Sequence, residues 1–146
     1  MKKIILITLP IAFVLCGFAG YRFANKESKD VANSKAEISI DANTLVATFN
    51  KDTATAKKLY IHKIIKICGK IKSIDPAGAV VLEGPEEESS IVCGLDPRHI
   101  SDLNKLNAGS IVVLQGRCTS YEKGEEMLGV NLGTTVQIAF AGVKKP

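Results

Sequence analysis

Isoleucine alternates with lysine through residues 61–74, and this alternation constrains the fold more than any other feature of the chain. From Lys66 to Lys72, lysine alternates with isoleucine or cysteine, and Gly69 lies inside the segment. Side chains of a β-strand point alternately to its two faces, so a period of two in β-branched residues predicts a strand. A glycine inside a long strand marks a bulge or a bend. The pattern therefore predicts a long, bent strand from Ile61 to Ile74.

Shorter hydrophobic segments, separated by turn-forming residues, occupy 79–82, 90–94, 111–117 and part of 127–141. A helix is expected before residue 107, because Asp96-Pro97 is an N-cap followed by proline at the first helical position.

Short helices are also expected before the long strand, where Asp41 and Asp52 are suitable N-caps. This order predicts a mainly β protein, the five-stranded Greek-key barrel known as the OB-fold, with a helix between strands 3 and 4. Another small β-barrel or an α+β sheet is the alternative.

A stretch of 18 residues without a charge, Ile4 to Tyr21, follows Lys2-Lys3 at the N-terminus. As a helix it would be about 27 Å long, close to the hydrocarbon thickness of a bilayer. Three interpretations remain open: an uncleaved transmembrane anchor, a signal peptide cleaved after Ala19, or a lipoprotein signal with Cys16 lipidated. The first leaves the protein membrane-anchored and the second secretes it. All three place the remaining chain on the extracytoplasmic side, in a periplasm or at a cell surface.

Composition divides the chain into three regions. Residues 1–22 are expected to be a membrane anchor or signal peptide, residues 23–40 a flexible polar linker, and residues 41–146 the OB-fold domain. The formal net charge is +4, and most of this excess lies in the first 40 residues. The basic charge is therefore no indication that the folded domain binds polyanions.

Several spacings in the folded region match a known family. They comprise a tyrosine before a G-x-I-x-x-I strand, a hydrophobic residue before cysteine, and L-x-x-L-x-x-G before a strand with G-x-C. The residues are Tyr60, Gly69, Ile71, Ile74, Val92, Cys93, Leu103, Leu106, Gly109, Gly116 and Cys118. With them, residues 41–138 resemble the tRNA_anti-like OB-fold family of short exported bacterial proteins. The resemblance implies the fold but no established activity, and the further cysteine that the family often has in its last strand is missing here.

The three cysteines of the folded region, Cys68, Cys93 and Cys118, are each 25 residues apart. This spacing is unlike that of zinc ligands, and we expect neither a metal nor a cofactor. The cysteines are either small buried hydrophobic residues or, in an oxidising compartment, include one disulfide. If a disulfide forms, Cys68–Cys118 is the expected pair, because the first and fourth strands of an OB barrel are neighbours.

Ligands of OB-folds bind on the face of strands 2 and 3, between two loops. Here residues 83–88 are rich in glutamate, and the loop after the fourth strand has further glutamates and a single aromatic residue. Single-stranded nucleic acid requires a basic groove with stacking aromatic side chains, so this groove is better suited to a cationic ligand. The residues expected to contact a ligand are Tyr121, Arg117, Glu83, Glu126 and Lys70.

The sequence contains no G-x-S-x-G motif, no H-E-x-x-H motif and no glycine-rich loop of the kind that binds phosphate. We therefore expect a binding module without enzymatic activity, with a protein or a small molecule of the cell envelope as its ligand. The alternative is an OB-fold that binds single-stranded DNA or RNA. Joint exposure of Tyr121, Arg117 and Lys70 would favour that alternative.

Overall fold

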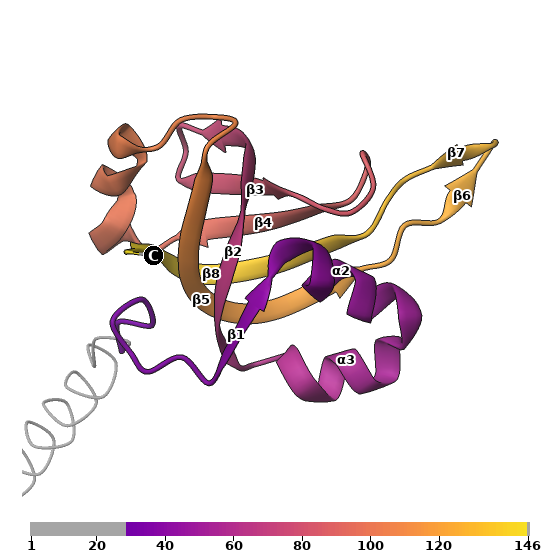
Figure 1. Ribbon diagram of the computed structural model, residues 1–146, viewed down its shortest axis with the longest axis horizontal. Helices are drawn as coiled ribbons and strands as arrows, with labels where there is room; N and C mark the ends of the chain where they lie inside the picture. Colours follow the sequence, from indigo (N-terminus) through magenta and orange to yellow (C-terminus); the bar gives the residue numbers. More distant parts are fainter. Residues whose placement is uncertain (1–28, 146) are drawn as a thin grey trace, which may run out of the picture.

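Five strands close into a barrel within residues 29–145, the part of the chain that the computed structural model describes (Figure 1). Around the barrel the order is β2 (Ile64–Asp75), β3 (Ala79–Glu83), β4 (Ser90–Leu95), β8 (Thr135–Lys144) and β5 (Ile111–Glu122). Pairing of β2 with β5 closes it, and β4 and β8 run parallel. This is the strand order of an OB-fold, which confirms the predicted mainly β barrel.

Strand β2 bends and changes partner along its length. Ile65, Ile67 and Ile71 are buried with period two, as the sequence pattern predicts. Residues Ile64 to Lys70 of β2 pair with β5, and from Ile71 the strand pairs with β3, with a register shift between Ile71 and Ser73. Gly69 lies where a Cβ atom would come within 2.7 Å of the Ala42 Cβ, so a larger residue there would push a helix off the barrel.

Helices cover the two ends of the barrel (Figure 1). At one end, α2 (Ala42–Lys51) and α3 (Thr53–Tyr60) bury Leu45, Val46 and Phe49 against the strands. At the other end, η1 (Pro97–Lys105), a 3₁₀ helix, follows β4 as expected. The N-terminal helix that the sequence predicts, from Ile4 to Tyr21, lies outside the described residues. Within residues 29–145, no helix has both the length and the apolar character needed to span a bilayer.

Asp96 anchors the start of η1 through a buried carboxylate. Its Oδ1 accepts hydrogen bonds from the Arg98 backbone N–H at 3.0 Å and Nε at 2.8 Å, and its Oδ2 lies 2.7 Å from the Arg98 guanidinium. The hydrogen bonds from the Arg98 side chain lower the pKa of Asp96 from 3.8 to about 2. Because the folded pKa is depressed, the resulting stability is present at neutral pH and is lost on acidification.

Asp96→Asn should therefore lower the free energy of unfolding by about 2 kcal/mol at pH 7, while the amide oxygen still caps η1. Between about pH 4 and about pH 2, the wild type should lose this advantage and the two proteins should converge. Urea unfolding across this pH range measures the difference. A difference that does not change with pH would contradict the assignment of the stability to the ionised carboxylate.

The N-terminal boundary of the folded unit requires a correction. The expected flexible linker, residues 23–40, is ordered against the barrel in its described part. Strand β1 (Ile38–Asp41) pairs in parallel with β2, and Val31 and Ala32 are buried. The Gln115 Nε2 of β5 donates to three backbone carbonyls of residues 31–34, at 2.6 to 3.0 Å. These contacts outweigh the polar composition of the segment.

The last predicted strand is present as β8, which begins within residues 127–141 and continues to Lys144. A small hairpin of β6 (Glu126–Met127) and β7 (Val130–Asn131) precedes β8 and projects from the barrel (Figure 1). Leu128, Gly129 and Gly133 have φ angles of 55°, 79° and 67°, which break the extended conformation. Strand β5 in turn continues to Glu122, beyond its predicted end.

Candidate functional site

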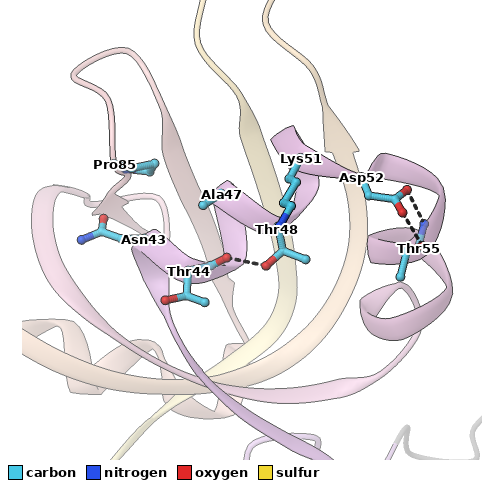
Figure 2. Close-up of a pocket in the computed structure, with 8 residues that line it drawn as sticks. All are labelled: Asn43, Thr44, Ala47, Thr48, Lys51, Asp52, Thr55 and Pro85. Atoms are coloured by element: carbon cyan, nitrogen blue, oxygen red, sulfur yellow. Dashed lines mark hydrogen bonds between the residues drawn. The ribbon is translucent and has the colours of Figure 1, made fainter.

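Three adjoining depressions run beside α2 and around the β3–β4 loop, with volumes of about 510, 330 and 300 Å³. The largest lies between the polar face of α2 and Pro85 of that loop (Figure 2). It shares Asn43 with the third depression and Pro85 with the second. We refer to this continuous surface as the acidic groove. Its charged residues are Asp41, Lys51, Asp52, Lys70, Lys72, Glu83, Glu86 and Glu87.

Side-chain caps hold the helical wall of the groove. The Asp41 carboxylate accepts from the backbone N–H groups of Asn43 and Thr44 at 3.0 and 3.4 Å, which fixes the start of α2. Asp52 accepts from the Thr55 hydroxyl at 2.6 Å and from its backbone N–H at 3.0 Å (Figure 2). The hydroxyl bond is the main cause that lowers the pKa of Asp52. Both carboxylates are therefore engaged in capping, and the free acidic groups of the groove come from the loop.

The β3–β4 loop is shaped by backbone contacts and presents its glutamates outward. Ser89 is buried, and its Oγ accepts from the Thr134 backbone N–H at 3.0 Å. At Gly84, a Cβ atom would lie 2.7 Å from the Ser89 carbonyl oxygen, so the loop turns where only glycine fits. Lys70 pairs with Glu83 at 3.1 Å, and Lys72 donates to the Glu87 backbone carbonyl. The side chains of Glu86 and Glu87 remain exposed.

The centre of the outer face of the described strands β3, β4 and β8, where OB-folds bind ligands, has no charged residue. Val81, Val92 and Gln137 lie side by side across the three strands, and all are half-buried. At the edge of this face, β8 shifts register against both neighbours, and Phe140 has a φ of 54° with 43% of its surface exposed. Among the described phenylalanine and tyrosine residues, Phe140 is the most exposed.

Sequence analysis did not single out Phe140. In the sequence, Val136, Ile138 and Phe140 continue one alternation, which predicts an inward side chain at residue 140. A bulge at that point turns one more side chain outward.

The structure separates the residues expected to contact a ligand. Lys70 and Glu83 meet in the acidic groove. The Tyr121 ring stacks on Phe49 with centroids 4.7 Å apart, and its hydroxyl lies 3.1 Å from the Thr53 Oγ1, so Tyr121 contributes to packing.

Arg117 is exposed on β5, opposite Ile64 and Ala139, six residues along the strand from the partner of Lys70. Glu126 belongs to the projecting hairpin, paired with Asn131. Tyr121, Arg117 and Lys70 therefore do not form one exposed cluster.

The expected Cys68–Cys118 disulfide is not formed, and the strand register explains why. Cys68 lies opposite Val113 on the outside of the barrel, whereas Cys118 is buried. Cys93 and Cys118 both pair with Ile138 of β8, from its two sides, and burial raises the pKa of each thiol to about 12. These two thiols are inert packing groups at neutral pH.

The strand order and the parallel β4–β8 pair define an OB-fold protein. The model of the tRNA_anti-like family matches residues 1–130, and the chain belongs to this family. No curated protein matches it.

Among solved structures, the chain is similar to a proposed nucleic acid-binding lipoprotein from Klebsiella pneumoniae, with 16% identity and a TM-score of 0.51. The match covers 73% of this chain and 92% of that one. An aspartyl tRNA synthetase from Entamoeba histolytica has 12% identity and a TM-score of 0.40, over 75% of this chain and 25% of that chain. At these identities, the likeness to the Klebsiella protein shows the fold alone.

Proposed function

We propose that this protein is a non-enzymatic binding module of the cell envelope that takes a cationic segment of a partner protein in the acidic groove. The observation that carries the proposal is the charge of the groove. Five carboxylates line it against three lysines. The Lys70–Glu83 ion pair neutralises one charge of each sign, and Lys72 donates to the loop backbone. Asp41 and Asp52 cap helices, so Glu86 and Glu87 are the carboxylates that remain to bind a cationic ligand.

An extended, lysine- or arginine-rich peptide fits this arrangement. The depression beside α2 offers neutral hydroxyl and amide groups from Asn43, Thr44 and Thr48. The adjoining depression, which shares Pro85 with it, offers the exposed Glu86 and Glu87. Opposite charges at the rim accelerate association and select the partner. The partner would meet the groove on the extracytoplasmic side, with the segment Ile4 to Tyr21 as membrane anchor or as a cleaved signal peptide.

Binding of a fluorescein-labelled decalysine peptide to the full chain, followed by anisotropy over a salt series, tests this function. Glu86→Gln/Glu87→Gln should weaken peptide binding about tenfold at low salt. The matched control is Glu122→Gln/Glu125→Gln, which removes the same charge from residues outside the groove lining. Equal losses in both variants would show that only net charge matters, and the proposed site would then be wrong.

Single-stranded nucleic acid is the second candidate ligand, and Phe140 favours it. An exposed aromatic ring on the OB face can stack on a base, and Arg117 lies on the adjacent strand, opposite Ala139. The similar Klebsiella protein is described as nucleic acid-binding. Tight binding of oligothymidylate that is lost in Phe140→Ala, with no binding of decalysine, would replace the first function by this one.

A further inference from the structure

A second cavity lies between the end of α3 and the outer side of β5, and it differs in charge from the acidic groove. Its volume is about 510 Å³. Lys57, Lys58 and His62 line one side, and Thr119, Ser120 and Tyr121 line the other. No aspartate or glutamate is among its lining residues, and it shares none of them with the acidic groove.

Lys57 lies over the Tyr121 ring, which is stacked on Phe49. Its Nζ lies 5.6 Å from the centre of the Tyr121 ring, and that ring is held by Phe49 on one side and by the Thr53 hydroxyl at its edge. A cation over an aromatic ring is attracted to it without being neutralised. Among the described residues, neither Lys57 nor Lys58 has a carboxylate within ion-pair distance.

The His62 backbone is held in a conformation that non-glycine residues rarely adopt. Its φ is 66°, and its N–H donates to the Cys118 carbonyl at 2.7 Å. The Cys118 N–H in turn donates to the Lys63 carbonyl at 3.0 Å. His62 follows the C-cap Ile61 of α3, at the position where a left-handed conformation commonly ends a helix. These backbone contacts fix His62 in the lining of the cavity.

We propose that the cavity between α3 and β5 binds a phosphate group. Lys57, Lys58, His62 and Ser120 line this one space, so two ammonium groups, an imidazole and a hydroxyl are available there. A phosphate carries up to two negative charges and three strong acceptor oxygens, which such a set of donors can satisfy together.

The test is calorimetric titration of the full chain, in a non-ionic detergent, with inorganic phosphate at constant ionic strength. The wild type should bind one phosphate per chain. Lys57→Ala/Lys58→Ala should raise the dissociation constant at least about tenfold. The matched control, Lys35→Ala/Lys123→Ala, removes two exposed lysines that line neither the cavity nor the acidic groove, and it should bind as the wild type does.

His62→Gly provides an independent variant, because glycine accepts the φ of 66° without strain. It should raise the midpoint of thermal unfolding and still weaken phosphate binding about threefold. Full affinity in this variant, or in Lys57→Ala/Lys58→Ala, would overturn the assignment. So would the absence of phosphate binding by the wild type.

A hexathymidylate without terminal phosphate separates two sources of the group. Competition with inorganic phosphate would assign a phosphodiester, and phosphate binding without competition would assign a free phosphate or a monoester. Either outcome supports the site. Because the two sites share no lining residue, Lys57→Ala/Lys58→Ala should leave decalysine binding unchanged, so this proposal and the proposed function can fail separately.

Discussion

Phe49→Ala should lower the free energy of unfolding by about 3–5 kcal/mol. The Phe49 side chain is fully buried between α2 and the barrel. Its ring stacks on Tyr121 at 4.7 Å and lies 5.9 Å from the Tyr60 ring at an interplanar angle of 45°. Truncation therefore removes transfer energy, leaves a cavity and breaks two aromatic contacts, which each add about 1 kcal/mol to simple burial.

Urea unfolding at 25 °C measures this loss, and Leu59→Ala is the matched control on α3. Leu59 is 47% exposed, so its truncation should cost less than about 1 kcal/mol. Comparable losses in the two variants would mean that the helices do not pack on the barrel end as described. Because Phe49 fixes α2, its loss should also weaken decalysine binding at the acidic groove.

Much of the barrel could be predicted from local patterns. Alternation in β2, the Asp96-Pro97 cap and the turn residues are short-range signals, and each corresponds to an element of the structure. The helices after Asp41 and Asp52 follow the same rule, because the capping contacts span only two or three residues. Failures occurred where the decisive contact is long-range. Residues 29–40 look like a linker until Gln115, more than 80 residues away, supplies their hydrogen bonds.

The candidate site was less predictable than the fold. Lys70 and Glu83 were both expected to contact a ligand, and the structure places them together in the acidic groove because they lie on strands that pair. The role of Tyr121 depended on whether a helix covers the end of β5, which no pattern within β5 reveals. Cys68 could have been placed outside the barrel from the alternation alone, because its neighbours Ile67 and Gly69 are on the buried face of the strand. Position 140 required the bulge in β8, which depends on the register of two neighbouring strands.

A chain that begins at residue 41 should be less stable than one that begins at residue 29 by about 4 kcal/mol. The shorter chain lacks Val31, Ala32 and nearly all of β1, and these are buried or paired in the structure. It also leaves the buried Gln115 amide without its three carbonyl acceptors. Urea unfolding of the two chains measures the difference, and equal stability would restore the flexible linker that the sequence predicts.

Gln115→Leu separates the hydrogen bonds from the rest of that loss. In the chain that begins at residue 29, the substitution should cost about 1–3 kcal/mol, because the carbonyls of Val31, Ala32 and Ser34 lose their donor. In the shorter chain, the donor has no partner to lose, so the same substitution should be nearly neutral or stabilising. The difference between the two costs is the coupling energy between Gln115 and the N-terminal segment. If Gln115→Leu costs the same in both chains, the loss of stability arises within the barrel. Residues 29–40 would then contribute nothing to stability through Gln115.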